Sequence, residues 1–416
     1  MPRTRPLWLR RLNSICLFGF VGLSQLSITV GELFGFLGLL VWWGGWAAGY
    51  AESSQYRFPL LKNFLLFSLA NILAVLTGYY PPESAGHLKK LLEPLVFYWI
   101  LNQVPHDFRD WKAVLSPGPG RWPWLKKLLS RFGGVSPMQM LMTLLVAATA
   151  LSASLGIYQR LANGRLRVYG PLNNPITFSV VLMMVGVFLL AWIIKTREGR
   201  FWKIISLVVI VWALLLTLTR EAWLGFLGGA MVVLVSKSRK WLLAFPLLMV
   251  MVYLGMPESI QNRFDTIFQM REGAIVNRLK LWKASFAVIR DHPVTGVGFN
   301  GFKFLKYDYP DDRELFSKYS HFHNAFIQIL VDAGLIGLLT WLSIWVGFYR
   351  ELFLLKMKKW QSENDSWLIP GAGASVFAFL IACLFENHFY DQEVMLVLYV
   401  IMALPFVNPH RKLQSS

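Results

Sequence analysis

Two imidazoles and an amide lie together where a polar loop meets a long apolar run. His321, His323 and Asn324 come directly before the apolar segment 327–339. Ionisable side chains at a membrane boundary are costly to hold in lipid and therefore mark candidate functional sites. Neighbouring arginines would keep His323 neutral, and a neutral imidazole can accept or orient the proton of a hydroxyl group. The alternative is a structural histidine that caps the helix, with His321 and Asn324 as supporting residues in either case.

A metal centre is the other kind of chemistry that paired histidines support. Residues two apart do not share one face of a helix, so His321 and His323 chelate poorly if the helix has already begun. A metal would need further ligands, for which His388 and Asp391 at the last outer turn are candidates. We expect neither a metal nor another cofactor.

Arg220 is the first of three candidate phosphate-binding arginines. It lies in the run Thr-Leu-Thr-Arg-Glu-Ala-Trp at 217–223, where two apolar segments meet with almost no connecting loop. A guanidinium held at this depth suits bidentate binding of a phosphate. The alternative is that Arg220 snorkels to lipid headgroups or pairs with Glu221.

Arg278 is the second candidate, and it belongs to a predicted helix over residues 276–290. Apolar residues at 279, 282, 286 and 289 recur at helical spacing, which indicates an amphipathic helix near the membrane interface. Lys280 and Lys283 make this helix basic, although attraction to anionic lipid also accounts for them. Arg167, on the short segment 159–173, is the third candidate.

A turn-rich segment at 291–302 follows the predicted helix. Pro293 and the nearby glycines force turns there. Gly296 and Gly298 would permit a close approach of backbone to a phosphate, but a bare Gly-x-Gly pattern is weak support for such a site.

Composition identifies the environment of these residues. Of 416 residues, 55% are hydrophobic and 15% charged, whereas soluble domains have about a quarter charged residues. The chain is therefore expected to be an integral membrane protein. Its formal net charge of +18 is attributed to basic cytoplasmic segments rather than to nucleic-acid binding. Cys16 and Cys383 both lie in apolar runs, which argues against a disulfide framework.

Twelve transmembrane helices are predicted, since a helix needs about 20 residues to cross the hydrocarbon layer. A tight turn near residues 31–32 should separate the first two. We treat the N-terminal basic and apolar stretch as an uncleaved first helix. The fold class is thus all-α and polytopic, with residues 1–416 forming a single transmembrane domain. The expected spans are 12–30, 32–50, 59–78, 88–104, 138–158, 174–194, 202–219, 221–236, 241–256, 323–349, 367–386 and 390–407.

Lysine and arginine distribution sets the expected orientation. Most of those in short connecting segments fall on one side when both termini are cytoplasmic. Segment 105–137 is then a cytoplasmic loop beside the lipid headgroups, and 257–322 is a large periplasmic loop. Structureless loops of that length are uncommon unless they are functional.

Taken together, these motifs resemble the O-antigen ligase family, bacterial polytopic ligases and polymerases that act on undecaprenyl-diphosphate glycans. Over residues 165–345 the resemblance is carried by the outer Gly-x-x-x-Asn loop, the corner at 217–223, Arg-x-x-x-Trp at 278–282, His-Pro-x-x-Gly-x-Gly at 292–298, and the His-Asn motif at 323–338.

The resemblance implies a bundle of twelve helices with a large periplasmic loop, and a site at the periplasmic face of the inner membrane. It implies inverting, metal-independent transfer of a glycan from undecaprenyl diphosphate to lipid A–core, as in lipopolysaccharide biosynthesis. His323 would activate or position the acceptor hydroxyl, and Arg220, Arg278 and, less directly, Arg167 would bind the diphosphate.

Two alternatives remain open. An O-antigen polymerase or a protein O-oligosaccharyltransferase would use the same motifs with another acceptor. A transporter would use outer-face ionisable groups as a permeation path, but it should show broken helices near the midplane, often in repeated halves. Asp332, inside the tenth expected span, is the main intramembrane charge, and a hydrogen bond across a helix contact would explain it.

Overall fold

The computed structural model describes residues 6–50, 57–107, 137–243, 254, 261, 273–357 and 365–407, and no strand occurs among them. Its longer helices are α1 (Leu7–Leu23), α2 (Ile28–Ala47), α3 (Leu61–Thr77), α5 (Leu95–Asp107), α8 (Pro137–Asn163), α9 (Pro175–Lys195), α10 (Arg200–Leu216), α11 (Arg220–Lys237), α14 (Gly273–Asp291), α17 (Ala325–Met357), α18 (Leu368–Cys383) and α19 (Gln392–Ala403). Shorter elements are α4 (Pro81–Ala85), η2 (Leu88–Leu92), η3 (Gly301–Phe304), α15 (Leu305–Asp308), η4 (Pro310–Asp312), α16 (Arg313–Lys318), η6 (His388–Tyr390) and η7 (Leu404–Phe406).

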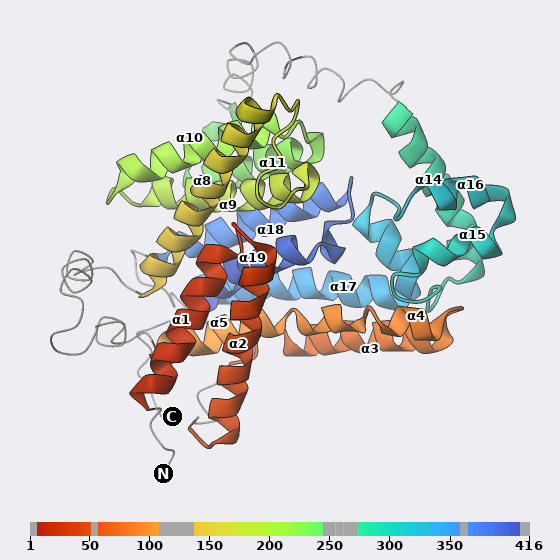
Figure 1. Ribbon diagram of the computed structural model, residues 1–416, viewed down its shortest axis with the longest axis horizontal. Helices are drawn as coiled ribbons and strands as arrows, with labels where there is room; N and C mark the ends of the chain where they lie inside the picture. The colour runs from red at the N-terminus through yellow and green to blue at the C-terminus, as the bar shows by residue number, and fades with distance from the viewer. Residues whose placement is uncertain are drawn as a thin grey trace.

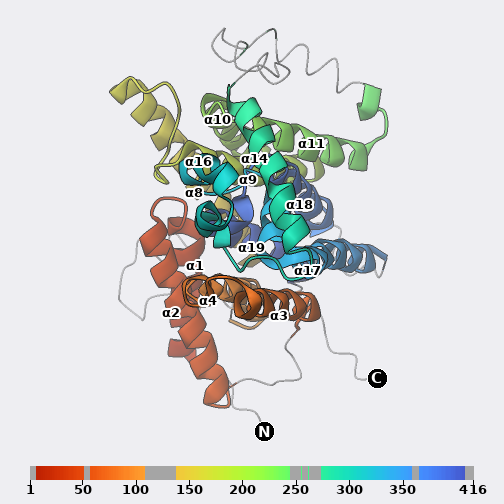
Figure 2. The ribbon, with the colours of Figure 1, turned by 90° about the vertical axis from the view of Figure 1, so that its right-hand side faces the viewer.

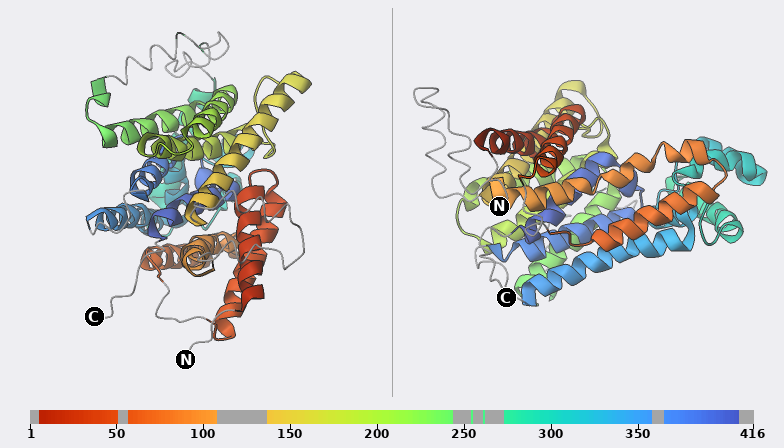
Figure 3. Two further views of the ribbon diagram at one scale, coloured as in Figure 1. Left: turned by 90° about the vertical axis from the view of Figure 1, so that its left-hand side faces the viewer. Right: turned by 90° about the horizontal axis from the view of Figure 1, so that it is seen from below.

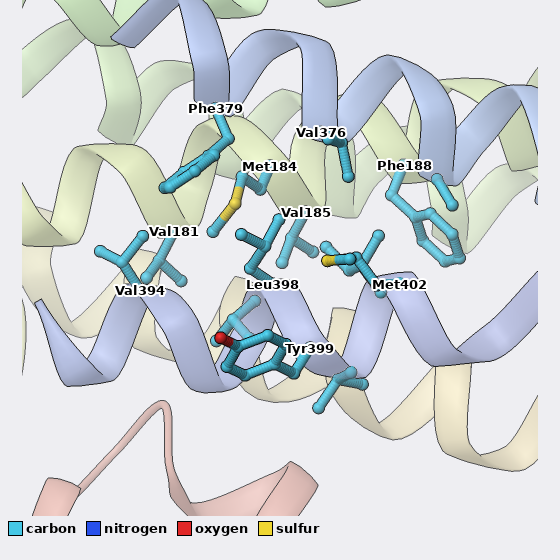
Figure 4. Close-up of a cluster of buried hydrophobic side chains, with 14 of the residues drawn as sticks. Val181, Met184, Val185, Phe188, Val376, Phe379, Val394, Leu398, Tyr399 and Met402 are labelled. Carbon is cyan, nitrogen blue, oxygen red and sulfur yellow. The ribbon is translucent and has the colours of Figure 1, made fainter. Parts of the chain in front are cut away.

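Helix α9 is the centre of the bundle. It is apolar along its whole length and is contacted by α8, α10, α11, α18 and α19, which is the usual placement of a helix that is hydrophobic all round. Figure 4 shows Met184, Val185 and Phe188 of α9 in one buried cluster with Phe379 of α18 and Leu398 of α19. This packing fixes the ends of α9 and α18 relative to each other.

Among the residues that the structure describes, four helices are long and apolar enough to cross a membrane: α2, α9, α17 and residues Met138–Asn163 of α8. Shorter apolar helices occur at Leu61–Thr77, Leu368–Cys383 and Gln392–Phe406. The chain is accordingly a multi-pass helical membrane protein, and twelve spans remain a prediction. The expected span 241–256 and the expected cytoplasmic loop 105–137 lie largely outside the described residues.

The expected turn near residues 31–32 is wrong, because α2 already begins at Ile28. The chain instead reverses between Leu23 and Ile28. A Cβ on Gly31 would lie only 2.5 Å from the Cα of Ser24. Gly31 therefore serves the close approach of two helices rather than a turn.

The fourth expected span, 88–104, is not one continuous α-helix. Its first residues form the short 3₁₀ helix η2, and α5 begins only at Leu95. Pro94 lies directly before α5, and proline is accepted at a helix start but interrupts a helix interior. The lysines and Glu93 of this segment thus lie outside the regular α-helix.

Helix α14 and the short helices α15 and α16 gather at one end of the molecule, which we call the loop end (Figure 1). Helices α3 and α17 run side by side toward it (Figure 3, right), and Figure 2 looks onto it with α14 and α17 in front. A separate hydrophobic cluster, which includes Leu281, Val288, Phe302 and Phe322, holds these elements together.

The predicted helix 276–290 is confirmed as α14, but its buried face differs from the predicted apolar face. Leu281 and Val288 are fully buried, whereas Leu279 and Phe286 are 49% and 70% exposed. Because both faces carry apolar residues, helical spacing alone did not identify the one that packs on the protein. The exposed face suits a membrane interface, as predicted for this helix.

Candidate functional site

Helix α17 is broken near its start, where the turn-rich segment 291–302, which we call the docked loop, packs against it. Gly334 has φ 63°, outside the helical region, and the backbone amides of Val297 and Gly298 donate to the carbonyls of Val331 and Asp332 at 2.9 and 3.0 Å. On the other side of the break, the amide of Leu335 donates to the carbonyl of Pro293 at 2.9 Å. The turn-rich segment thus replaces hydrogen bonds that the helix gives up.

The glycines of this segment permit that close backbone contact. A Cβ on Gly296 would lie 2.4 Å from the carbonyl oxygen of Val331, and one on Gly334 would lie 2.2 Å from the carbonyl of Val294. Both glycines also have positive φ, where other residues are strained. The close approach made here is to α17 itself, and not to a phosphate as the Gly-x-Gly pattern allowed.

Asp332 lies fully buried at the break and is satisfied by several hydrogen bonds. Tyr390 donates its hydroxyl to Oδ2 at 2.7 Å, and Gln328 donates its amide to Oδ1 at 3.0 Å. Backbone groups of Asn300 and Gly301 also bond to this carboxyl. The prediction of a hydrogen-bonded role is confirmed, but the partners come from α17 itself, from the docked loop and from η6 rather than from a contact with another membrane helix.

The histidines lie just before α17, in a segment fixed by Phe322. The Phe322 ring is fully buried against Phe302 and Phe316, and its carbonyl accepts the indole N–H of Trp282 in α14 at 2.9 Å. His321 and His323 stand together, with ring centroids 4.3 Å apart. The helix begins only at Ala325, so the argument that helical geometry separates the two histidines does not hold.

Asn324 ties the start of α17 to the end of α18. Its side-chain oxygen accepts the amide of Ile327 at 3.1 Å, and its side-chain nitrogen donates to the carbonyl of Leu384 at 2.9 Å. The first is a helix-capping bond. His323, directly before it, has φ 49°, a conformation that is uncommon outside glycine and clusters at functional sites.

Glu386 joins the two histidines and an arginine. Its Oε1 is 2.5 Å from His321 Nε2, its Oε2 is 2.8 Å from His323 Nδ1, and Arg278 approaches Oε2 at 3.6 Å. The carboxylate is only 4% exposed. Burial alone raises the pKa of Glu386, but the hydrogen bonds and charges of His321 and His323 outweigh it and hold that pKa well below its ordinary value. Glu386 is therefore ionised at neutral pH.

A cavity of about 430 Å³ opens beside this cluster, within the size range of small-molecule sites. Its walls come from the first turn of α9, the docked loop and the segments before α17 and α19, and they include Asn174, Thr177, Asn300, Lys303, His323 and Asp391. His87 also lines the cavity. Burial, and to a smaller extent the positive charges of nearby lysines, lowers the pKa of its imidazole. Amides, a hydroxyl, imidazoles and one ammonium are groups that recognise a hydroxyl-rich molecule.

A second histidine–carboxylate pair lies behind the cavity. His388 is fully buried, with Nδ1 3.2 Å from Asp391 Oδ2. Burial lowers the pKa of His388, but Asp391 and the more distant Glu386 and Glu221 outweigh it, so that the pKa is raised. The sequence interpretation offered His388 and Asp391 as further ligands for a metal at His321 and His323. The structure pairs them with each other, and the carboxylate beside the two histidines is that of Glu386.

Of the three candidate arginines, Arg278 shares the Glu386 carboxylate with His323. Arg220 is the first residue of α11 and is half-buried. Arg167 donates to the carbonyl of Thr217 at 2.6 Å and to the hydroxyl of Thr219 at 2.8 Å, so it braces the corner before Arg220. Among the described residues that line the cavity, none of these arginines is included.

The corner at 217–223 nevertheless borders the cavity. The Thr219 hydroxyl lies 3.5 Å from the carbonyl of Pro175, and the adjacent residues of α9 line the cavity. Trp223 closes the corner by donating its indole N–H to the carbonyl of Leu214 at 3.0 Å. The threonine and tryptophan of the motif thus hold the turn after which Arg220 begins α11.

His321, His323 and Glu386 together also have the donor types of a metal site. One ligand atom from each lies within 4.8 Å of the others, and such a set suits a divalent transition metal. The guanidinium of Arg278, 3.6 Å from the same carboxylate, opposes a second positive charge there. The absence of a metal stays a prediction, and chelation tests it.

Glu386 is the site residue that the sequence interpretation missed. It lies more than sixty positions from His321 along the chain, so no local spacing connects them. The available signal was an acid placed where an apolar span ends, next to the histidine and aspartate already noted.

Comparison with known proteins connects this site to one family. Residues 205–342 match the model of the family described as O-Antigen ligase. An O-antigen ligase from Pseudomonas aeruginosa is 28% identical over 226 residues, covering 51% of this chain and 50% of that protein. The exopolysaccharide production protein ExoQ of Rhizobium meliloti is 26% identical over 137 residues, covering 30% of this chain and 29% of its own.

These matches span half or less of each relative's length. The segment 205–342 includes the corner with Arg220, helix α14 with Arg278, the docked loop, and His323 at the start of α17. Glu386 lies beyond it. The resemblance predicted from the motifs is thus confirmed: residues 205–342 of this chain are similar to the O-antigen ligase family.

Proposed function

We propose that this protein is an O-antigen ligase, a glycosyltransferase that moves a glycan from undecaprenyl diphosphate to lipid A–core during lipopolysaccharide biosynthesis. The family match supports ligase- or polymerase-type activity. The acceptor, the inversion at the anomeric carbon, and the location at the periplasmic face of the bacterial inner membrane, with both termini cytoplasmic, are parts of the proposal.

One observation carries it: His323 lines a polar cavity and shares a buried carboxylate with Arg278. A base that can accept the proton of a hydroxyl group is thus connected, through Glu386, to a cation that can bind a phosphate. These are the two functions that displacement of a diphosphate by a sugar hydroxyl needs.

His323 acts on the acceptor hydroxyl, and the arginines act on the departing diphosphate. Charge grows on the leaving oxygen as its bond to the sugar breaks, and fixed cations in a site of low dielectric stabilise that charge. Arg278 and Arg220 supply this stabilisation, and Arg167 holds the corner that presents Arg220. Because guanidiniums carry this role, no metal or other cofactor is required.

The membrane supplies the lipid-linked donor. Several helices present apolar side chains outward, including Leu33 and Phe36 of α2 and Leu335 of α17. A polyprenyl tail lies along such a surface while its diphosphate reaches the loop end. Membrane lipids are therefore partners of the protein in this proposal, whereas nucleic acid is not.

A polymerase is the second candidate, favoured by the similarity to an exopolysaccharide production protein. It uses the same chemistry with a second lipid-linked glycan as acceptor. A protein O-oligosaccharyltransferase differs only in accepting a protein hydroxyl.

A transporter is disfavoured by the way in which α17 is broken. The break at Gly334 meets one expectation for a transporter, but the carbonyls of Val331 and Asp332 beside it accept amides of the docked loop. They are occupied by protein and not available to coordinate a permeating ion.

The test is transfer by purified protein in liposomes or nanodiscs. Protein is mixed with undecaprenyl-diphosphate glycan and lipid A–core, and conjugates are resolved on a gel. A ligase produces a glycan–lipid A conjugate, whereas a polymerase lengthens the lipid-linked glycan without lipid A–core. Absence of both products, with folded protein and intact donor, contradicts the proposal, and the anomeric configuration of the product tests inversion.

A further inference from the structure

The two neighbouring histidines contact the same carboxylate through different ring nitrogens. His321 meets Glu386 through Nε2, whereas His323 meets it through Nδ1. The amide of Asn387 also donates to Glu386 Oε1 at 3.0 Å. Each histidine nitrogen in contact with an ionised carboxylate carries a proton, because such a carboxylate only accepts hydrogen bonds.

These contacts assign opposite tautomers to the neutral rings. His321 is protonated on Nε2, and its Nδ1 lone pair lies 2.9 Å from the Ser320 hydroxyl, which can donate to it. His323 is protonated on Nδ1, which leaves the Nε2 lone pair on the opposite side of its ring. Within the part of the chain that the structure describes, no hydrogen bond engages that Nε2.

We infer that Glu386 is a positioning residue that makes the two histidines unequal, leaving only His323 Nε2 free to accept a proton. This inference deepens the proposed function and rests on it for the identity of the proton donor, which is a sugar hydroxyl. His321 acts through Glu386: it helps to fix the carboxylate and does not take the substrate proton.

The transfer step follows with its atoms balanced. The acceptor O–H bond breaks and its proton moves to His323 Nε2. The acceptor oxygen forms a bond to the anomeric carbon, while the bond from that carbon to the diphosphate oxygen breaks and the diphosphate leaves with the electron pair. Glu386 stabilises the imidazolium, because the carboxylate already holds its Nδ1–H. The proton then returns to solvent or to the diphosphate.

Glu386 also couples this step to diphosphate binding through Arg278, whose guanidinium approaches the same oxygen as His323 Nδ1 does. One carboxylate thus orients the base and the cation together. That explains why an acid, which would repel a diphosphate if it were unpaired, is buried here.

Nuclear magnetic resonance of ¹⁵N-histidine-labelled protein tests the tautomers directly. The chain has seven histidines, and His321→Gln and His323→Asn assign the two signals. At about pH 8, above the ordinary pKa of histidine, we expect wild-type His323 to be protonated on Nδ1 and His321 on Nε2. A wild-type His323 protonated on Nε2 overturns the inference, and this result does not depend on transfer activity.

Variants test the consequence for transfer. Glu386→Gln removes the ionised acceptor, so we expect His323 to lose its single tautomer and transfer to fall roughly 10²–10⁴-fold. Glu351→Gln is the matched control. Among the described residues, the ion-pair partner of Glu351 is the neighbouring Arg350, at 3.0 Å, so this variant should leave both readouts as in the wild type. Wild-type tautomers and transfer rate in Glu386→Gln would also overturn the inference.

A second pair of variants separates the two histidines. Gln at 321 still offers an N–H near the position of Nε2, so His321→Gln should retain much more activity than His323→Asn, which keeps a donor near Nδ1 but lacks Nε2. Equal losses of activity in the two variants would contradict the inference that the two histidines have different roles. If wild-type protein shows no transfer, the proposed function fails, while the NMR spectrum still decides the tautomers.

Discussion

The centre of the bundle and the loop end both contain buried side chains, but different kinds of interaction hold the two regions together. Around α9, apolar side chains such as Val185 and Leu398 interdigitate, and close packing is what they contribute. At the loop end, Glu386, Asp332 and Asn324 are also buried, and each has specific polar partners. The first region makes the protein stable, and the second places chemical groups. Changes in the two regions should therefore fail in different ways.

The largest effect is expected from His323→Ala. If His323 handles the acceptor proton, transfer should fall by roughly 10²–10⁴-fold, while the unfolding temperature stays close to that of the wild type. Initial rates in the reconstituted assay and thermal unfolding in the same detergent measure the two quantities.

Leu398→Ala, which removes a fully buried side chain in Figure 4, is the contrasting variant. It leaves a cavity and should lower the unfolding temperature, while the folded fraction transfers glycan at the wild-type rate. The comparison between the two regions breaks down if His323→Ala transfers normally, or if both variants lose stability equally.

Arg278→Ala and Arg220→Ala should each lower the transfer rate by about 10²–10³-fold, the usual cost of one lost transition-state contact. Arg278→Lys should recover only part of that loss, since an ammonium lacks the planar fork that meets a phosphate with two hydrogen bonds. Rates measured at a saturating concentration of the glycan donor separate a slower transfer step from weaker binding of the donor. Unchanged rates for either alanine variant would remove that arginine from the proposed mechanism.

Gly334→Ala should affect both regions, because it disturbs the joint between them. A Cβ there lies 2.2 Å from the Val294 carbonyl at positive φ, so the docked loop must shift and Asp332 loses its backbone partners. We expect a lower unfolding temperature and a transfer rate reduced about tenfold or more.

Gly44→Ala is the matched control for this change. Its Cβ meets nothing within 4 Å, and it lies within the regular helix α2. If Gly44→Ala and Gly334→Ala behave alike, then contact with the docked loop is not what position 334 contributes.

The smallest effect is expected from removal of metals. Incubation with EDTA followed by desalting should leave the transfer rate unchanged, since guanidiniums carry the diphosphate charge. If activity is lost and then restored by a divalent cation, His321, His323 and Glu386 would become ligands, and the interpretation of the loop end would change with them.

Local sequence patterns predicted the parts of the site that depend on neighbours in the chain. The helix around Arg278, the corner before Arg220 and the polar start of α17 were all visible, because capping, turn and amphipathic signals act over a few residues. Long-range pairing was not visible. Neither Glu386 nor the docking of the 293–298 segment onto α17 has a local signature.

Glycines show the same limit. Gly31 suggested a turn, and Gly296 suggested a phosphate site, yet each permits one backbone to approach another. A glycine indicates that another group lies close to its Cα, but only the folded structure identifies that group. The buried face of α14 was hidden for a similar reason, because both of its faces carry apolar side chains.

Glu386 lies outside the segment 205–342, although both histidines that it contacts lie inside it. A graft of that segment alone into a relative would carry the histidines without their carboxylate. Swaps meant to exchange acceptor preference should therefore include residues 384–391, which supply both Glu386 and the carbonyl that Asn324 binds. The natural unit of exchange runs from α10 to the start of α19.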